Sequence, residues 1–257
     1  MTLQALVFDV DGTIADTEEV HRQAFNAAFL AMDLWWNWSP AEYMELLKVS
    51  GGPERVAHYV AQLRVPEKER ARLAGLVPAI HRDKTRLYHE LISGGRAPLR
   101  PGVLRLIGEA RAAGLRLALA ATSTKANVEA LVSATLGAKA LGWFSAVASA
   151  DEVARKKPAP DVYERVLGTL RLPASACVAI EDSENGVHAA KAAGLYTIAT
   201  PSRWTLTQDF SGADLVLYSL GDPDAPLDRV TAGAIGGSQL GLAQIRTLHA
   251  ARAARAA

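Results

Sequence analysis

The sequence has little of several features that would point to a specialised class of protein. It contains a single cysteine, Cys177, so neither an intrachain disulfide nor a cluster of thiolate metal ligands can form. Its 28 lysines and arginines nearly balance its 27 aspartates and glutamates. A net charge of +1 argues against binding of nucleic acid or an anionic membrane through bulk charge. With 20 glycines and 12 prolines in 257 residues, collagen-like and low-complexity chains are excluded.

No stretch of the sequence resembles a targeting or membrane-spanning segment. The chain reaches Asp9 without the basic region and long apolar run of a signal peptide. The longest apolar stretches, such as 117–121, have the length of a strand and not of a spanning helix. A hydrophobic content of 49% is enough to bury a sizeable core. We therefore expect a cytoplasmic, monomeric globular protein of one or two domains that binds neither nucleic acid nor a membrane.

Short apolar runs alternate with helical patterns along most of the chain. The apolar runs are bounded by turn residues and lie at 3–8, 115–121, 147–150, 177–180, 196–199 and 215–217. Their nearly continuous apolar character indicates strands buried on both faces. The helical patterns occupy residues 101–113, 124–136, 159–170 and 184–193. This alternation predicts an α/β fold with a Rossmann-like parallel-sheet core flanked by helices.

The first predicted strand is followed by about eighty residues without a strand signal. Helical patterns at 18–32, 40–48, 53–63, 66–76 and 79–92 predict four or five helices in this region. We therefore expect a helical-bundle cap over residues 16–95, inserted after the first strand of a catalytic core that comprises 1–15 and 96–240. We expect the cap to move on hinges at 12–18 and 93–97.

Three smaller features suggest local structure. Trp35, Trp36 and Trp38 lie close together, and we expect them to pack at a helix end. Residues 221–241 are rich in glycine, proline and aspartate, which indicates a loop. Residues 241–257 carry several arginines and form a basic tail or a short helix, which we expect to be solvated or frayed.

Four acidic residues follow two of the predicted strands. Asp9 and Asp11 come directly after the first strand, ahead of Gly12, and Glu181 and Asp182 follow a later strand. In an open α/β sheet the carboxyl ends of the strands form the ligand-binding edge. Close carboxylates repel each other unless a cation lies between them, and oxygen ligands suit Mg²⁺. The acids therefore favour a magnesium site, although an aspartate before a glycine is also an ordinary turn.

Two further signals lie at the same predicted edge. Thr122, Ser123 and Thr124 follow another strand, where hydroxyls and helix-start N–H groups either cap the next helix or bind an anion. Lys157 precedes Pro158, and a residue before proline favours an extended backbone. Its ammonium either belongs to a charged loop or points into the site.

The order of these motifs resembles that of the haloacid-dehalogenase-like phosphotransferase superfamily. The matching residues are Asp9-Val10-Asp11-Gly12-Thr13, Thr122, Lys157-Pro158 and Glu181-Asp182. The helical insertion also stands where this family has its cap. The resemblance implies that Asp9 is a nucleophile forming an aspartyl-phosphate, and that Asp11 is the general acid and then the general base.

The same resemblance implies roles for the remaining motif residues. Mg²⁺ would be held by the carboxylates of Asp9 and Asp182 and by the backbone carbonyl of Asp11, with Glu181 among or beside the ligands. Thr122 and the N–H of Ser123 would hold the phosphoryl oxygens. Lys157 would balance the charge of the phosphate and the acids.

Asp11 narrows the resemblance within the superfamily. Its dehalogenases lack this second acid and its transport ATPases carry threonine there, so phosphoester chemistry is expected. Segments 15–26, 46–52, 54–55, 81–85 and 121–131 resemble the CbbY-like group, whose characterised members dephosphorylate sugar bisphosphates, notably xylulose 1,5-bisphosphate. The resemblance implies a small sugar phosphate as substrate. Its expected binding residues are Gly12, Glu18, His21, Gly51, Gly52, Glu54, Arg55, Lys84, Ser123 and Thr124.

Pro53 departs from the pattern of that group, which has lysine between the two glycines and the Glu54-Arg55 pair. Loss of that cation would remove a contact to a distal phosphate worth on the order of 1.5–3 kcal/mol, unless Arg55 or Lys84 compensates. A sugar phosphomutase shares all the core motifs and remains an alternative. A non-catalytic binding or regulatory module is the alternative of another class, although retention of a carboxylate cluster argues against it.

Overall fold

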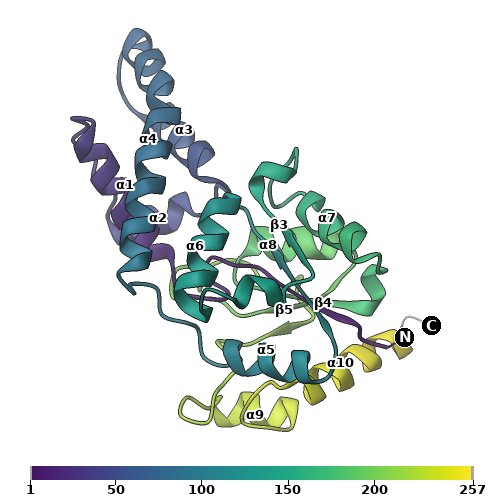
Figure 1. Cartoon of the computed structure of the whole chain (residues 1–257). Helices are drawn as coiled ribbons and strands as arrows, with labels where there is room; N and C mark the ends of the chain where they lie inside the picture. The colour runs from purple at the N-terminus through teal and green to yellow at the C-terminus, as the bar shows by residue number, and fades with distance from the viewer. Residues whose placement is uncertain (1, 256–257) are drawn as a thin grey trace.

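Six parallel strands form one sheet within the described part of the chain. The computed structural model describes the backbone of residues 2–255 and the side chains of residues 2–252. The strands lie in the order β3-β2-β1-β4-β5-β6, and all neighbours are parallel. This confirms the predicted α/β core, at the lower right of Figure 1. The strands are β1 (Ala5–Phe8), β2 (Arg116–Ala120), β3 (Ala146–Ala148), β4 (Cys177–Glu181), β5 (Tyr196–Ala199) and β6 (Leu215–Val216).

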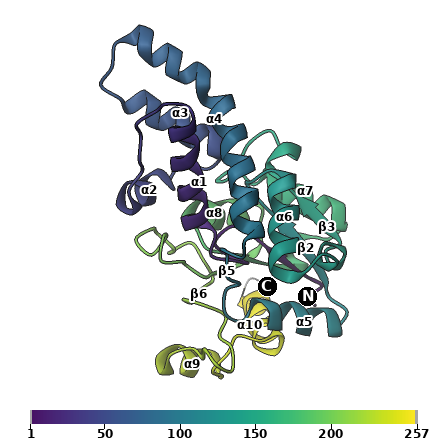
Figure 2. The same ribbon diagram turned by 60° about the vertical axis from the view of Figure 1, so that its left-hand side comes forward.

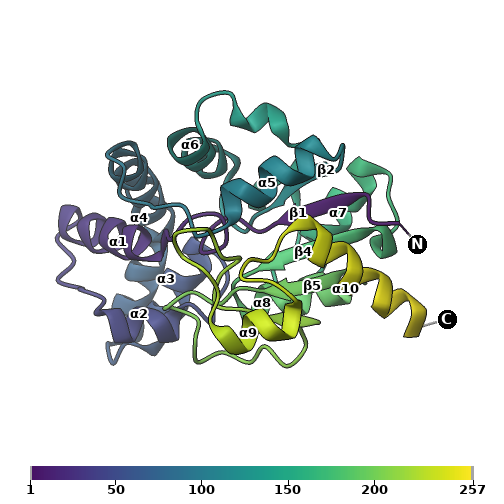
Figure 3. The same cartoon turned by 90° about the horizontal axis from the view of Figure 1, so that it is seen from below.

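The two faces of the sheet carry side chains of different size. Because side chains alternate along a strand, Leu6 and Phe8 of β1 point to one face and Ala5 and Val7 to the other. The face of larger side chains packs against α5 (Val103–Ala112), α6 (Lys125–Leu136) and α10 (Leu242–Arg255), and Figure 3 shows α5 and α10 beside the sheet. The face of smaller side chains packs against α7 (Asp161–Leu170) and α8 (Glu184–Ala192). Both faces are therefore covered, as the continuous apolar runs require.

The chain leaves β1 and builds a helical cap before it returns to the sheet. Residues 18–93, all described, form α1 (Glu18–Ala31), α2 (Pro40–Leu46), α3 (Gly52–Gln62) and α4 (Glu67–Ser93). Figure 2 shows these helices standing together on one side of the sheet, with α3 and α4 extending furthest from it. Ser39 accepts a hydrogen bond from the Glu42 N–H and caps α2, which begins at Pro40.

Four of the expected four or five helices form, because the patterns at 66–76 and 79–92 belong to one helix, α4, whose 27 residues run through Pro78. A proline inside a helix removes one backbone hydrogen bond and costs about 3 kcal/mol. The buried side chains of Leu73, Val77 and Ile80 flank the proline and pack in the interior of the cap. Their burial offsets the lost hydrogen bond, so tertiary packing overrides the local break.

Aromatic residues fill the interior of the cap. Phe25, Phe29, Trp38 and Tyr43 are buried together, with ring centroids 4.8–6.4 Å apart. Trp36 packs against the same cluster, whereas Trp35 is 91% exposed. The expected packing of the three tryptophans therefore holds for two of them.

One member of this aromatic cluster comes from the core and not from the cap. Trp204, in the loop after β5, is only 4% exposed, and its ring lies 5.8 Å from that of Tyr43. The same loop is tied to the sheet edge, because the Thr205 hydroxyl donates to the backbone oxygen of Asp182. Trp204 thus joins the cap interior to the core.

Two linking segments, at residues 15–16 and 98–99, connect the cap to the core and lie side by side. Asp16 N donates to Pro98 O at 3.0 Å, and Ala15 forms an antiparallel bridge with Leu99. Just beyond this crossing, the Arg100 guanidinium donates to four backbone oxygens. Those acceptors belong to Gly12, Thr200, Pro201 and Tyr218. Arg100 therefore fixes the core end of the connection, next to the loop that follows β1.

The C-terminal region is more ordered than its composition suggests. Residues 221–241 contain a short helix, α9 (Arg229–Ile235), capped by the Asp228 carboxylate, so the loop prediction is wrong there. A frayed end is also contradicted over the first part of α10, because Ile245 is fully buried against the core. Arg252 extends this docking through an ion pair with Asp214. The predicted tail residues beyond 255 lie outside the described chain, and among the described helices none is both long and apolar enough to span a bilayer.

Candidate active site

Adjacent strands bring the acidic residues together. β1 pairs with β4 so that Phe8 lies beside Ile180, and the next residues along each strand are Asp9 and Glu181. Asp9 N continues the ladder by donating to Ile180 O at 2.9 Å. Carboxylate oxygens of Asp9, Glu181 and Asp182 lie within 4.8 Å of one another, and all three residues are buried. The predicted acidic cluster therefore forms at the carboxyl edge of the sheet.

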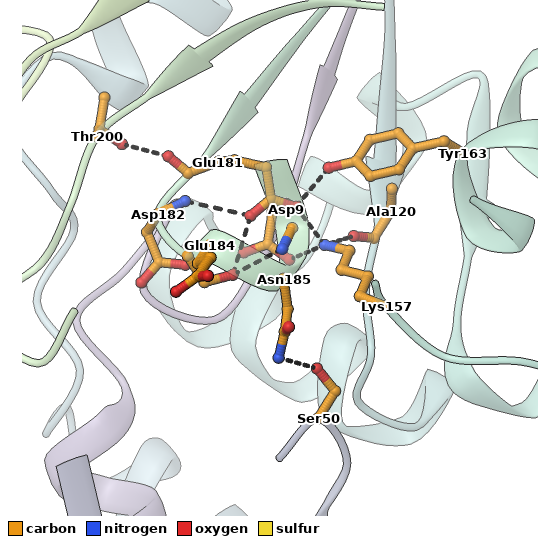
Figure 4. A network of polar contacts seen from close by, with 12 residues as sticks. Asp9, Ser50, Ala120, Lys157, Tyr163, Glu181, Asp182, Glu184, Asn185 and Thr200 are labelled. Atoms are coloured by element: carbon orange, nitrogen blue, oxygen red, sulfur yellow. Dashed lines mark hydrogen bonds and ion pairs between the residues drawn. The ribbon is translucent and has the colours of Figure 1, made fainter. Parts of the chain in front are cut away.

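Lys157 neutralises part of this cluster. Its ammonium lies 2.6 Å from Asp9 Oδ1 and 2.5 Å from Glu181 Oε1, and it also donates to Ala120 O at 2.9 Å (Figure 4). Burial acts to lower the pKa of Lys157, but the charges of Asp9 and Glu181 outweigh it and raise that pKa. The lysine is consequently a fixed cation at the floor of the site, and the charged-loop interpretation of this residue is wrong.

The carboxylates still hold more negative charge than one lysine balances. Burial, with the repulsion of Glu181 and Asp11, raises the pKa of Asp9 to about 7 despite the attraction of Lys157. Burial and the charges of Asp9 and Glu181 also raise the pKa of Asp182. Asp9 Oδ2 is buried and has no hydrogen-bond partner among the described residues. A buried carboxylate oxygen without a partner lies here next to a second carboxylate whose pKa is raised. A bound cation would stabilise the negative charge of both groups.

Glu181 is held differently from the other two acids. Tyr163, from α7, donates its hydroxyl to Oε1 at 2.5 Å, while Asp182 N donates to Oε2 at 3.2 Å. Any Cβ at position 186 of α8 would clash with the same carboxylate, so Gly186 makes room for it. Because both of its oxygens are hydrogen-bonded, Glu181 serves mainly to hold Lys157 and the backbone of Asp182 in place.

The backbone of Gly12 lies against the carboxylate of Asp182, and Gly12 is not among the residues that line the cavities described below. Its φ of +85° belongs to the left-handed region that favours glycine. A Cβ at this position would clash with the carboxylate of Asp182. Gly12 therefore lets the loop after β1 pass close to Asp182, and its predicted contact with the substrate stays a prediction.

Asp11 points away from the other acids and toward the cap. Its Oδ1 accepts a hydrogen bond from the Thr17 hydroxyl at 2.9 Å and lies 2.8 Å from His21 Nε2 and 3.3 Å from the Tyr88 hydroxyl. Lys84 Nζ lies 2.7 Å from the other ring nitrogen, His21 Nδ1. An ammonium can only donate, so the His21 ring accepts at Nδ1 and carries its proton at Nε2, where it faces Asp11.

These contacts set the protonation of the Asp11 network. Burial acts to raise the pKa of Asp11, but His21 and Lys84 outweigh it and hold that pKa well below its usual range. Burial and the neighbouring ammonium lower the pKa of His21. Burial likewise lowers the pKa of Lys84, to about 8. Near neutral pH the network therefore consists of a carboxylate, a neutral imidazole and an ammonium.

The hydroxyl segment after β2 lies opposite the acids. Thr122 lines both cavities of the site described below, and Ser123 and Thr124 line the larger one. Ser123 Oγ is buried and has no protein partner within the described chain. Thr124 accepts a hydrogen bond from Asn127 N and caps α6. Thr124 thus fulfils the capping alternative, while Thr122 and Ser123 remain available to an anion.

Two adjoining cavities occupy the space between the sheet edge and the cap. The smaller, of about 60 Å³, is bordered by Asp9, Lys157 and Asp182. The larger, of about 310 Å³, lies toward the cap. The two share the wall residues Asp11, Glu18, Gly51, Arg55 and Thr122.

The cap residues predicted to bind the substrate divide into those that line a cavity and one, Glu54, that does not. Glu18, His21, Gly51, Gly52, Arg55 and Lys84 line the larger cavity. Glu54 does not line either cavity, because its carboxylate pairs with Lys156 of the core. The backbone of Gly51 has a φ of +94°, and a Cβ there would lie 2.8 Å from Lys156 Nζ. The two glycines therefore make room for neighbouring side chains, since a Cβ at Gly52 would crowd the His81 ring in the same way.

Several residues of the site were not foreseen from the sequence. Tyr163 anchors Glu181, and Lys156 borders the larger cavity. Asn185 of α8 donates to Ser50 Oγ at 3.1 Å and so joins the core to the cap (Figure 4). Lys156 directly precedes Lys157, and this adjacency is the local signal of its position at the site. Tyr163 and Asn185 lie inside helices and carry no local signal of their roles.

The fold and the site define the class of this protein. The family model described as haloacid dehalogenase-like hydrolase matches residues 3–194. The chain belongs to this family and is a hydrolase of phosphoric monoesters.

Its relatives place it within the CbbY-like group of that family. It is 50% identical over 232 residues to CbbY of Cupriavidus necator, a match that covers 90% of this chain and 91% of that protein. The solved structure of a variant of CbbY from Rhodobacter sphaeroides in complex with xylulose 1,5-bisphosphate is similar, with a TM-score of 0.78 and 44% identity over 85% of this chain and 95% of that one. A β-phosphoglucomutase from Clostridium difficile, 19% identical with a TM-score of 0.71 over 99% of this chain and 100% of that one, shares the fold alone.

Proposed function

We propose that the protein is a Mg²⁺-dependent phosphatase that hydrolyses a small sugar bisphosphate such as xylulose 1,5-bisphosphate through an aspartyl-phosphate. The observation that carries the proposal is the arrangement around Asp9. One of its oxygens is fixed by Lys157, and the other is buried beside Asp182 without a hydrogen-bond partner among the described side chains. A nucleophilic carboxylate needs this combination of a fixed orientation and a free oxygen.

The residues present fit a magnesium ion. Asp9 and Asp182 would supply carboxylate oxygens, the Asp11 backbone carbonyl would supply a third protein oxygen, and Glu181 would stand behind them. The pKa values of Asp9 and Asp182 are raised because their negative charges are buried close together, and a bound divalent cation would neutralise those charges. When bound, Mg²⁺ supplies charge neutralisation for the transferring phosphoryl group.

The chemistry proceeds in two steps carried by side chains of the site. In the first, an Asp9 carboxylate oxygen attacks phosphorus, the ester P–O bond breaks, and the sugar oxygen takes a proton from Asp11. In the second, Asp11 removes a proton from water, which attacks the same phosphorus and releases inorganic phosphate and the Asp9 carboxylate. Lys157, Thr122 and the N–H of Ser123 hold the phosphoryl oxygens throughout. The contacts of Thr17 and His21 favour the carboxylate form of Asp11, which is the form that the second step uses. The first step therefore requires Asp11 to take up a proton when the substrate binds.

The larger cavity supports a sugar phosphate as substrate. It is lined by Glu18 and His21, which suit sugar hydroxyls, and by Arg55, Lys84 and Lys156, which suit an anion. A cytoplasmic compartment is part of the proposal, because a chain with a single cysteine is suited to a reducing environment.

Phosphate release from matched sugar mono- and bisphosphates tests the proposal, measured with Mg²⁺ and with EDTA. We expect release from xylulose 1,5-bisphosphate with Mg²⁺, loss of that activity in EDTA, and loss in Asp9→Asn. An isomeric phosphate ester without free phosphate would instead identify a phosphomutase. No conversion of any substrate, together with unchanged behaviour of Asp9→Asn, would favour the non-catalytic module.

A further inference from the structure

A bisphosphate has a second phosphoryl group, and the cations of the larger cavity decide where it binds. The smaller cavity holds the reacting group between Asp9 and Lys157, so the distal group extends into the larger one. Three lysine and arginine side chains line that larger cavity: Arg55, Lys84 and Lys156. The cap loop contributes Pro53, an uncharged residue, to the same cavity.

Two of these three cations are committed to protein partners inside the cap. Lys84 is buried, contacts His21 Nδ1 at 2.7 Å and lies over the rings of Phe25 and Tyr88 at 5.1 and 4.8 Å. Using Lys84 to bind a distal phosphate would dismantle the network that orients Asp11.

Arg55 is committed in a similar way. Its Nη1 donates to the Tyr43 hydroxyl at 2.9 Å, and its Nε donates to Leu46 O at 3.1 Å. The guanidinium also stacks over the Tyr43 ring at 5.2 Å. It can offer its remaining N–H groups to a ligand, but it cannot move far toward one.

Lys156 differs from both in its partner, which is a carboxylate of the cap. Its ammonium lies 2.6 and 2.7 Å from the two carboxylate oxygens of Glu54, on α3 of the cap. The side chains are 23% and 48% exposed, respectively, so each can exchange its partner for solvent or a ligand. Exposed ion pairs of this kind contribute little net stability. A phosphate dianion carries more charge than a carboxylate and can therefore replace Glu54 on this lysine.

We propose that Lys156 is the specificity-determining cation for the distal phosphoryl group and that Glu54 occupies its ammonium until substrate binds. This inference rests on the proposed function. Lys156 and Lys157 are consecutive residues, so one short segment of the core presents a cation to each end of the substrate. The cation for the distal phosphoryl group thereby comes from the core and not from the cap loop that contains Pro53.

A simple tie between cap and core is the competing explanation of the pair. Glu54 belongs to the cap and Lys156 to the core, so the ion pair also holds the cap against the sheet edge. A tie affects every substrate equally, and removal of either partner has the same effect. A phosphate-binding lysine affects only substrates with the distal group, and removal of Glu54 frees it.

The experiment compares Lys156→Met and Glu54→Gln on a sugar bisphosphate and on the same sugar carrying only the reacting phosphate. For Lys156→Met we expect KM for the bisphosphate to rise about ten- to a hundredfold, with a change of less than about threefold for the monophosphate. For Glu54→Gln we expect KM for the bisphosphate to fall about two- to fivefold, because a competing carboxylate is gone. Pro53→Lys in the Lys156→Met background should recover most of the loss.

Lys48→Met is the matched control, since Lys48 lies on the same side of the cap and pairs with Glu45 at the surface. Equal losses on both substrates, or a rise in KM for Glu54→Gln like that for Lys156→Met, would overturn the inference in favour of a tie. Calorimetric binding of the bisphosphate to Asp9→Asn, with and without Lys156→Met, repeats the test without turnover. If the wild-type protein released phosphate from neither compound, the proposed function would fail while this binding comparison still decided the role of Lys156.

Discussion

Replacement of Trp204 by alanine should impair closure of the cap. The indole belongs to the core but is buried against Tyr43 in the cap interior. A buried tryptophan removes about 150–250 Å² from water, which at about 25 cal/mol per Å² corresponds to roughly 4–6 kcal/mol in favour of the docked state. Truncation of such a side chain typically costs about 3–5 kcal/mol. We therefore expect kcat/KM of Trp204→Ala to fall at least about tenfold, by the same factor for sugar mono- and bisphosphates.

Trp35→Ala provides the matched control, because it removes the same side chain from a position that is 91% exposed. We expect its kinetics and melting temperature to match those of the wild-type protein. Steady-state kinetics on both substrates, with circular dichroism to confirm folding, make the comparison. If folded Trp204→Ala kept kcat/KM within threefold of Trp35→Ala, docking of this ring would not control catalysis, and the reasoning would be refuted.

Three further predictions concern the active site and the C-terminal helix. Lys157→Met leaves two buried carboxylates unpaired, so we expect at least a thousandfold loss of turnover and a loss of stability of about 3–5 kcal/mol, measured by urea denaturation. In EDTA the folded state keeps a proton on Asp9 between about pH 4 and about 7, whereas the unfolded chain has released it, so this group makes stability fall as pH rises. The rise in Tm on adding Mg²⁺ should therefore be larger at pH 7.5 than at pH 5. An equal pH-dependent increase in Asp9→Asn would contradict this prediction. Ile245→Ala should lower stability by about 2–5 kcal/mol with kcat unchanged, whereas an unchanged Tm would show that α10 does not contribute to the core.

The sheet and the acidic cluster could be predicted because their signals are local. Each strand is a short apolar run, and Asp9, Thr122 and Asp182 each lie within two residues of the end of one. Parallel pairing then aligns those ends without further information, which is how Asp9 and Asp182 meet. The capping and loop residues Thr124 and Gly12 also carried local signals, although Gly12 makes room for Asp182 and lines neither cavity.

The errors arose where distant parts of the chain decide the outcome. Pro78 breaks a helix locally, but burial of Val77 and Ile80 in the cap keeps α4 continuous. The C-terminal residues look solvated until the core is present to bury Ile245. The Lys156–Glu54 pair spans 102 positions, and no pattern within either segment predicts such a pairing.

The central position of β1 has a consequence for the order in which the protein can assemble during synthesis. β1 is made first, yet its partners lie at residues 116–119 and 177–180, so the earliest strand waits longest for its neighbours. The cap is completed in between, but its aromatic interior needs Trp204, which follows the last cap helix by 111 positions. At roughly 5–20 residues per second, that interior remains open for on the order of 6–20 seconds of translation. During this interval the nascent chain exposes the part of the aromatic cluster around Tyr43 that Trp204 later covers.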